Sequence, residues 1–339
     1  MNSLLWTLLI FVSVGIGVWL ASFGVEALRS APNPPKKLRW APGIKIDYVD
    51  ARSHKLRFIK SGQGPILVLL HTLRTQLDLF EKVIPELSKH FTVYALDYPG
   101  HGYSDIPNAR YDAKFFTEAV EGFLEKLDLH DVILAGVSIG GAIVLLIAAR
   151  RNPRVARVIA INPYDYAMGR SMARSSFLGW MITYASLIKG FGETVMRLRN
   201  FTVMKAVLRG GVADPKSIPV PLLEEMYLVG NRPRHYRAFI SLLRSADSWE
   251  TATRDYGRIN VPVLLIWGDQ DWSRASEREH DRKLIPNVQV TTLPAGGHFL
   301  SLDRPEELQQ LIIHFADPQA SQRVGQSDAD NRKSVSFLP

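Results

Sequence analysis

The chain of 339 residues contains no cysteine. Disulfide bonds, zinc sites with thiolate ligands and cysteine nucleophiles are therefore excluded, while the redox compartment stays open. The sequence also lacks any metal-ligand spacing, phosphate-binding glycine loop or dinucleotide fingerprint, so we predict neither a metal nor a cofactor. The net charge is +8, but no dense block of lysine and arginine and no interleaving of basic and aromatic residues accompanies it. We therefore expect no nucleic-acid partner.

Charge is also absent from the first part of the chain. Leu4–Val25 is almost wholly apolar and carries no charged residue, a length that can cross a bilayer as a helix. We predict an uncleaved single-pass anchor over residues 1–28, followed by a linker over 29–42 that contains the proline-rich Ala31–Pro35. The alternatives are a cleaved secretory signal and a buried core helix. Basic residues follow the apolar run, and by the positive-inside rule they keep that flank in the cytoplasm: Arg29, Lys36, Lys37 and Arg39.

The remaining chain, with 46% hydrophobic residues overall, is long enough for one large α/β domain with an insertion or for two domains. Apolar runs alternate with helical stretches, which predicts a mostly parallel, doubly wound eight-stranded sheet with helices on both faces. We expect this core over residues 43–162 and 261–316. Its expected strands are Ile44–Val49, Lys55–Ile59, Pro65–Leu70, Phe91–Asp97, the run before Ser138, Val155–Ile161, Val261–Trp267 and Val288–Leu293. Helical stretches are expected from Arg74 to His90 and over Ala113–Leu127.

Strands are missing between the sixth and seventh of these runs. We therefore predict that residues 163–260 form a helical cap, inserted after the sixth strand and lying over the carboxyl edge of the sheet. Its basic residues are interpreted either as a solvated face or as a surface that meets anionic lipid headgroups; they are Arg170, Arg174, Lys189, Arg197, Arg199, Lys205 and Arg209. The polar residues 317–339 are expected to be a disordered tail.

The stretch Gly136-Val137-Ser138-Ile139-Gly140 lies between a buried strand and an apolar helix. A strand that runs directly into a helix forces the residue at the corner into a strained conformation and leaves its side chain above the sheet edge. The sequence therefore predicts that Ser138 is a nucleophile. Free N–H groups at the start of the helix favour negative charge there, and Ile139 offers one such donor to an oxyanion.

A serine nucleophile needs a base and an acid that orients the base. His298 follows the last expected strand on a glycine-rich turn, and Asp271 follows the strand before it. Both are thus expected at the edge that carries Ser138. Asp165, after the sixth strand, is the alternative acid.

With these residues in this order, the chain resembles the α/β-hydrolase superfamily from about Gly43 to Ala316. His71 lies where the family places its oxyanion loop, residues 97–104 resemble the loop after its fourth strand, and Ser138, Asp271 and His298 match the order of its triad. The resemblance implies Leu73 as the second oxyanion donor. The family usually has His-Gly where this chain has His71-Thr72, so we expect the loop to differ in shape.

The architecture resembles membrane-anchored monoacylglycerol lipases and esterases of the superfamily, which implies a serine hydrolase that cleaves lipid-like carboxylic esters through an acyl-enzyme on Ser138. Its expected partners are a small acyl ester and a lipid bilayer.

Dehalogenases and epoxide hydrolases of this type carry aspartate where Ser138 stands. The alternatives are a carbon–carbon bond hydrolase, thioesterase or perhydrolase on the same triad, or a non-catalytic membrane-tethered binding protein.

Overall fold

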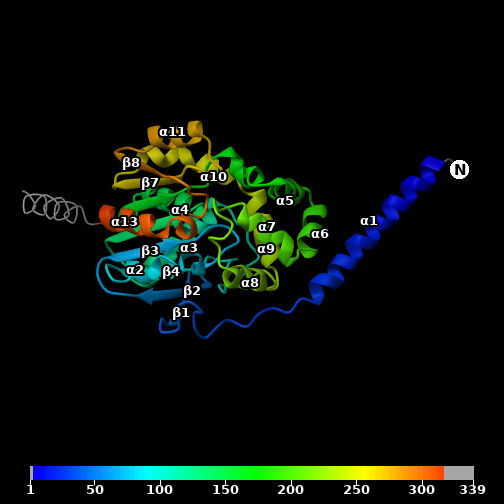
Figure 1. Ribbon diagram of the computed structural model, residues 1–339, viewed down its shortest axis with the longest axis horizontal. Coiled ribbons are helices and arrows are strands. Elements are labelled where there is room, and N and C mark those ends of the chain that lie inside the picture. Colours follow the sequence, from blue (N-terminus) through cyan, green and yellow to red (C-terminus); the bar gives the residue numbers. More distant parts are fainter. Residues whose placement is uncertain (1–2, 317–339) are drawn as a thin grey trace, which may run out of the picture.

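The apolar runs of the sequence form one eight-stranded sheet in the computed structural model, which describes residues 3–316 (Figure 1). The run predicted at residues 65–70 forms a strand whose side chains are buried almost throughout, as expected for a strand covered on both faces. The strands are β1 Ile46–Ala51, β2 His54–Ser61, β3 Ile66–Leu70, β4 Thr92–Leu96, β5 Val132–Val137, β6 Val155–Ile161, β7 Val263–Gly268 and β8 Val288–Leu293.

The strand order across the sheet is β1-β2-β4-β3-β5-β6-β7-β8. The pairs β1–β2 and β2–β4 are antiparallel, and all other neighbours are parallel. The chain leaves β3 in one direction and returns to add β5 on its other side, so the order reverses between these two strands. Loops that leave a sheet at such a reversal point diverge and open a crevice. The loop after β3 and the turn after β5 therefore border the same crevice.

Helices cover both faces of the sheet, and the predicted fold is confirmed. One face packs against α3 Ala113–Lys126, α4 Ile139–Ala149 and α11 Ala275–Leu284. The other packs against α2 Ile84–Leu87, α12 Leu300–Asp303 and α13 Pro305–Ala316.

The helical stretch expected from Arg74 to His90 is wrong as one element. The structure has the short 3₁₀ turn η1 Leu77–Phe80 and then the single turn α2. Asp78 forms an ion pair with the buried Arg57 at 3.2 Å, which ties η1 to the sheet. Pro85 lies in the first turn of α2 and cannot donate the hydrogen bond that would continue a helix from η1.

The cap consists of six α-helices and lies at the carboxyl ends of the parallel strands (Figure 1). They are α5 Phe177–Leu187, α6 Phe191–Arg197, α7 Phe201–Arg209, α8 Val220–Val229, α9 His235–Arg244 and α10 Asp247–Ala252. The 3₁₀ turns η2 Ala167–Gly169 and η3 Ser171–Arg174 lead into them, and η4 Thr253–Arg258 leads back to β7. The insertion after the sixth strand is thus found where the sequence predicts it.

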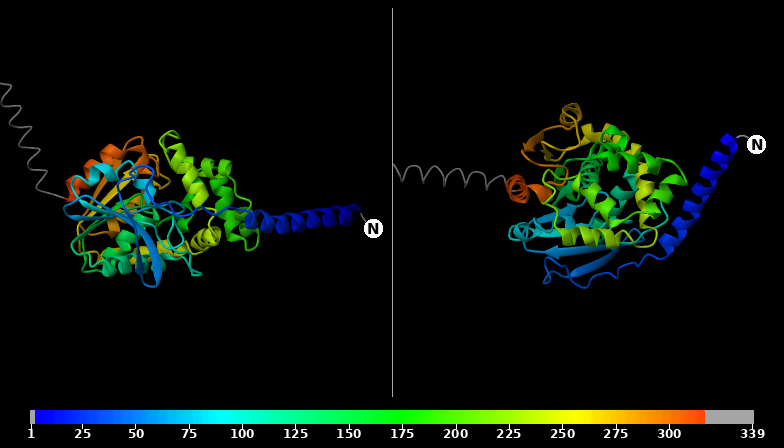
Figure 2. Two further views of the ribbon diagram at one scale, coloured as in Figure 1. Left: turned by 90° about the horizontal axis from the view of Figure 1, so that it is seen from below. Right: turned by 45° about the vertical axis from the view of Figure 1, so that its right-hand side comes forward.

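The N-terminal helix α1, Ser3–Ala27, projects away from the sheet beyond the cap (Figures 1 and 2). Its most apolar 18-residue window has a mean hydropathy of 2.3, and no residue of that window is buried. By length and composition, α1 could cross a membrane, and a signal sequence would have the same properties.

The last turns of α1 contact the cap through polar side chains. Arg197 donates a hydrogen bond to Ser22 Oγ at 2.9 Å, and Arg199 Nη1 forms an ion pair with Glu26 Oε2 at 2.6 Å. Arg29, just after α1, donates to the carbonyl oxygen of Arg197 at 2.9 Å. The interpretation of the cap arginines as a solvated or headgroup-facing surface is therefore wrong for Arg197 and Arg199, because both are buried. The expected tail, residues 317–339, lies outside the described residues.

Candidate active site

Ser138 occupies a sharp turn with no intervening loop between β5 and α4. Its backbone has φ 60° and ψ −118°, a conformation that costs a non-glycine residue about 1–3 kcal/mol. The two flanking glycines make the turn possible. A Cβ on Gly136 would lie 2.2 Å from the backbone of Gly140, and one on Gly140 would lie 2.3 Å from the carbonyl oxygen of Leu70. The local sequence therefore holds the serine hydroxyl in a strained position at the start of a helix.

His298 and Asp271 are in direct contact at the same edge of the sheet. His298 Nδ1 lies 2.5 Å from Asp271 Oδ1, and both side chains are fully buried. The other oxygen, Oδ2, accepts hydrogen bonds from the Ser273 N–H at 2.9 Å and the Tyr166 hydroxyl at 3.2 Å. Burial alone raises the pKa of the Asp271 carboxyl, but the contacts with His298 and Ser273 outweigh it and lower this pKa below its ordinary value. The carboxylate is thus ionised at neutral pH, and it fixes the imidazole with Nδ1 as the donor.

Two further contacts orient the histidine. The Trp272 ring stacks on the imidazole with 3.9 Å between centroids and 14° between planes. The Asn162 side-chain amide donates to the carbonyl oxygens of Gly297 and His298 at 3.0 and 3.1 Å, and its oxygen accepts from the Gly268 N–H at 2.8 Å. Asn162 therefore joins the loops after β6, β7 and β8. Neither residue was predicted to be functional from the sequence, although Trp272 directly follows Asp271 and Asn162 directly follows β6.

The remaining polar atoms of this site lack protein partners. Within residues 3–316, Ser138 Oγ and His298 Nε2 are both buried and make no hydrogen bond. Tyr164 borders both residues, because its N–H donates to the Ser138 carbonyl oxygen at 3.1 Å and its ring centroid lies 6.1 Å from that of His298. A buried hydroxyl and a buried ring nitrogen without partners are costly for folding alone. Unpartnered polar atoms of this kind are expected in side chains that act on a bound molecule.

Two backbone N–H groups are candidates for an oxyanion site, one next to Ser138 and one in the loop that borders the same crevice. Ile139 is the first residue of α4, so its N–H has no partner within the helix. The N–H of Leu73, in the loop after β3, makes no hydrogen bond within the described part of the chain. Thr72 does not adopt positive φ, and the left-handed residue of this loop is Arg74, with φ 58°. The loop is held instead by His71, which donates from Nδ1 to the Thr72 carbonyl oxygen at 2.7 Å. Burial lowers the pKa of His71 to about 3, so its ring is neutral and shapes the loop.

The sheet order and the helices on both of its faces agree with what comparison with known proteins finds. A family model described as the alpha/beta hydrolase fold matches residues 65–305. The chain belongs to the α/β-hydrolase family.

Relatives of this α/β hydrolase carry several activities. The carboxylesterase YbfK of Bacillus subtilis is 26% identical over 281 residues, which cover 81% of this chain and 89% of YbfK. A haloalkane dehalogenase from Psychrobacter cryohalolentis is 28% identical over 288 residues, which cover 78% and 89% of the two chains. The crystal structure of Cfl2 from Burkholderia cenocepacia matches with a TM-score of 0.73 and 21% identity, covering 85% of this chain and 100% of Cfl2. The last likeness shows the fold alone, so the chemistry of this hydrolase has to be argued from its own site.

The alternative acid lies apart from the histidine of this hydrolase. Asp165 accepts a hydrogen bond from the Tyr256 hydroxyl at 2.5 Å, and no contact joins it to His298 within residues 3–316. Burial raises the pKa of Asp165 to about 6, and Asp281 is its acidic neighbour. Asp271 is thus the carboxylate that contacts the histidine. No cluster of three or more possible metal ligands occurs in the described residues.

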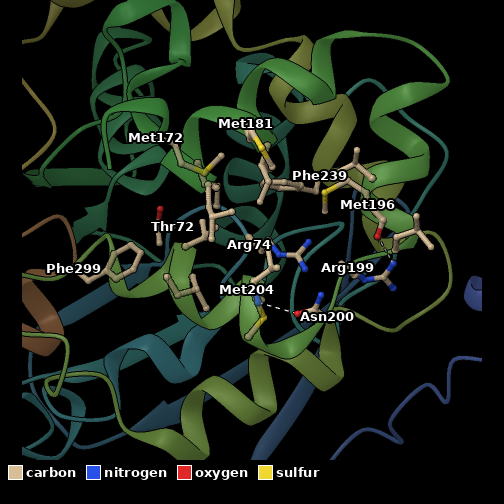
Figure 3. A pocket seen from close by; sticks show the side chains of 18 of the residues that line it. Thr72, Arg74, Met172, Met181, Met196, Arg199, Asn200, Met204, Phe239 and Phe299 are labelled. Atoms are coloured by element: carbon tan, nitrogen blue, oxygen red, sulfur yellow. Dashed lines mark hydrogen bonds between the residues drawn. The ribbon is translucent and has the colours of Figure 1, made fainter. Parts of the chain in front are cut away.

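A cavity of about 290 Å³ lies between the sheet edge and the cap (Figure 3). Trp272 and Phe299, which contact or adjoin His298, form one part of its wall together with Leu73. Most of the rest is apolar and comes from α5, α6 and α7: Leu178, Met181, Ile182, Val195, Met196, Val203, Met204, Val207 and Leu208. The cavity therefore begins at residues that contact or adjoin His298, although Ser138 and His298 are not themselves in its lining, and it continues beneath the cap. Its apolar walls suit an apolar chain.

Proposed function

We propose that this α/β hydrolase is a serine esterase that cleaves carboxylic esters with lipid-like acyl chains, such as monoacylglycerols. The observation that carries the proposal is that Ser138 Oγ and His298 Nε2 are both buried without a partner, while the other ring nitrogen of His298 contacts the carboxylate of Asp271. The apolar cavity supports the choice of an acyl chain over a small polar substrate.

In the proposed reaction, Ser138 Oγ attacks the ester carbonyl carbon while His298 Nε2 takes the hydroxyl proton. The carbonyl oxygen becomes an oxyanion that accepts hydrogen bonds from the N–H groups of Ile139 and Leu73. The imidazolium, stabilised by Asp271, then protonates the departing alkoxide, which leaves an acyl group on Ser138. Water attacks this acyl-enzyme with His298 as the base, and the carboxylic acid and the free hydroxyl are regenerated.

We further propose that α1 spans a membrane and that the hydrolase domain lies on the cytoplasmic side, where the basic residues after α1 place it. An aromatic patch on α5 and α6 supports a position at the bilayer surface. Its members are exposed and lie on helices that contact each other, and α6 contacts α1; they are Phe177, Trp180, Tyr184, Ile188 and Phe191. Tryptophan and tyrosine favour the membrane–water interface. The aromatic patch, rather than the buried arginines of the cap, would rest on the headgroups.

Hydrolysis of p-nitrophenyl esters of increasing acyl length by the full-length protein in non-ionic detergent tests the reaction. We expect activity to rise from acetyl to medium and long chains. Ser138→Ala should lower kcat by about three orders of magnitude or more and abolish labelling by a fluorophosphonate probe, with an unchanged circular dichroism spectrum. A variant that keeps more than about a tenth of the activity would disprove the role of Ser138.

The membrane proposal has an independent test. The protein should stay in the membrane fraction during sodium carbonate extraction, and protease added outside intact cells should leave the hydrolase domain uncut. Release by carbonate, or digestion from outside, would overturn the proposed topology without affecting the proposed chemistry.

A further inference from the structure

Two charged side chains that the proposed reaction does not use, Arg74 and Arg199, line the cavity beneath the cap. Arg199 is paired with Glu26, and Arg74 has no ion-pair partner among the described residues. Arg74 directly follows Leu73 in the loop after β3, and its backbone is left-handed, with φ 58°. Its guanidinium lies among the cavity-lining side chains and extends away from Thr72 and Phe299 toward Arg199 and Asn200 (Figure 3). A permanently charged group thus lies in a space whose walls are otherwise mainly apolar.

Arg74 has no polar partner in the part of the chain that the structure describes. Its Nη1 is completely buried, and within residues 3–316 no hydrogen bond or ion pair involves its guanidinium. The contact that remains is with the face of Phe239, whose ring centroid lies 5.1 Å from the guanidinium carbon. This situation differs from that of Arg57, a buried arginine that lies 3.2 Å from each of two carboxylates. The fold therefore supplies counter-charges to a structural arginine and leaves Arg74 without one.

The two charged groups with the largest electrostatic effect on Arg74 are also positively charged. Burial, with Arg199 and Arg29 acting in the same direction, lowers the pKa of Arg74 to about 9. The carboxylate of Glu26 is already bonded to both of these neighbours. At neutral pH, Arg74 still carries its proton, so the cavity holds an uncompensated positive charge. A buried charge without a partner is strongly unfavourable, and it persists where a bound molecule supplies the opposite charge.

We propose that Arg74 binds an anionic oxygen group of the substrate, a carboxylate or a phosphate. This inference deepens the proposed esterase function and rests on it. The preferred substrate is then an amphiphile, with an apolar chain against the methionine-rich wall of α5–α7 and one negative charge at Arg74. Because Leu73 and Arg74 are adjacent, binding of the anion at Arg74 also fixes the loop that offers the Leu73 N–H to the oxyanion. A planar guanidinium matches the two oxygens of either anion.

Three esters with an eight-carbon acyl chain test the proposal and locate the anion. p-Nitrophenyl octanoate is neutral, the mono-p-nitrophenyl ester of suberic acid carries a carboxylate at the far end of the acyl chain, and 4-nitro-3-(octanoyloxy)benzoate carries one on the alcohol part. With the wild-type protein, we expect kcat/KM for one of the anionic esters to exceed that for the neutral ester by about 10- to 100-fold, the range of a charged hydrogen bond. The anionic ester that is preferred shows which part of the substrate reaches Arg74.

Arg74→Met keeps much of the side-chain volume and removes the charge, so it should bring this ratio to about one or below. Arg74→Lys keeps the charge without the planar fork and should give an intermediate ratio. Lys205→Met is the matched control, because it removes a positive charge from α7 at a residue that does not line the cavity, and it should leave the ratio unchanged. Equal kcat/KM for all three esters in the wild type, or an equal loss on all three in Arg74→Met, would overturn the proposal.

A binding measurement separates this proposal from the proposed reaction. Ser138→Ala protein in phosphatidylcholine nanodiscs is titrated with octyl phosphate and with octanol, with and without Arg74→Met. We expect octyl phosphate to bind at least about tenfold more tightly than octanol, and this difference to vanish when Arg74 is replaced. If the two ligands bind equally well to the arginine-containing protein, Arg74 does not recognise an anion, whatever the ester assays show. If the difference is found but no ester is hydrolysed, the proposed reaction is wrong and the anion site stands.

Discussion

Replacing Asp271 by asparagine should disable the site through the tautomer of His298 rather than through loss of packing. In the native protein, Asp271 Oδ1 faces His298 Nδ1 at 2.5 Å, and Oδ2 accepts from Ser273 and Tyr166. An asparagine has one oxygen and one NH₂ group for these two places. Because the Ser273 N–H and the Tyr166 hydroxyl donate to the Oδ2 position, the amide oxygen is favoured there and the NH₂ group is left facing His298.

An NH₂ group at that position donates to Nδ1, so the proton of the neutral imidazole moves to Nε2. A protonated Nε2 cannot accept the hydroxyl proton of Ser138. The imidazolium that forms during the reaction also loses its carboxylate. We therefore expect kcat to fall by about 10³- to 10⁴-fold, or about 4–5.5 kcal/mol in activation free energy, with a smaller change in KM.

The assay is hydrolysis of p-nitrophenyl octanoate by full-length protein, with the circular dichroism spectrum and the melting temperature as checks of folding. Asp165→Asn is the matched control, since Asp165 is also buried after a core strand but bonds to Tyr256. It should retain activity within about threefold of the wild type. A folded Asp271→Asn variant with more than about a tenth of wild-type kcat, or a larger loss in Asp165→Asn, would refute the reasoning.

Three further predictions concern stability and the membrane. The pKa of Asp165 in the folded protein, about 6, lies above its value in the unfolded chain, so stability from this group is present at low pH and lost as the pH rises through about 6. Asp165→Asn should therefore raise the melting temperature by about 2–4 °C at pH 8 and by roughly half as much at pH 5, as followed by circular dichroism; a larger gain at pH 5 would contradict this. Glu26→Gln leaves Arg199 without its carboxylate and should lower the free energy of unfolding by about 2–3 kcal/mol in denaturant titrations in detergent, whereas an unchanged midpoint would contradict the buried ion pair. A spin label at Phe177→Cys in liposomes should collide more with oxygen than with a water-soluble nickel chelate, and one at Lys126→Cys on α3 should show the reverse; equal behaviour would remove the aromatic patch from the bilayer.

Much of the sheet could be predicted because its signals are local. A continuous apolar run marks a strand buried on both faces wherever it occurs, and a serine between two glycines at the end of such a run marks a sharp turn. Asp271 and His298 could be proposed because residues that end parallel strands gather at one edge. Their mutual contact is now described, while the catalytic roles of these residues remain predictions.

The features that the sequence did not reveal depend on contacts between distant residues. Arg197 and Arg199 look like surface residues of a basic helix, and their burial follows from Ser22 and Glu26, more than 170 positions earlier. In the sequence, Arg74 resembles any loop arginine. Only the folded structure shows that the cavity residues around it include no carboxylate within the described part of the chain. The stretch after Arg74 has helical composition, but the ion pair between Asp78 and Arg57 holds η1 against the sheet, and the stretch forms two short elements instead of one helix. No local pattern encodes such pairings.

The docking of α1 on the cap affects how the protein can be oriented and how it can be shortened. A helix joined by a flexible linker could reorient independently of the hydrolase domain, whereas α1 is bonded to the cap, so a tilt of α1 also moves the cap helices above the cavity. If α1 spans a bilayer as proposed, changes in bilayer thickness that tilt α1 would also displace the cap helices that line the cavity. A fragment that begins at Gly43 would lack Ser22, Glu26 and Arg29, and two buried arginines of the cap would then face water or each other. Soluble versions of this hydrolase should therefore retain the final two turns of α1, with its exposed apolar residues replaced by polar ones.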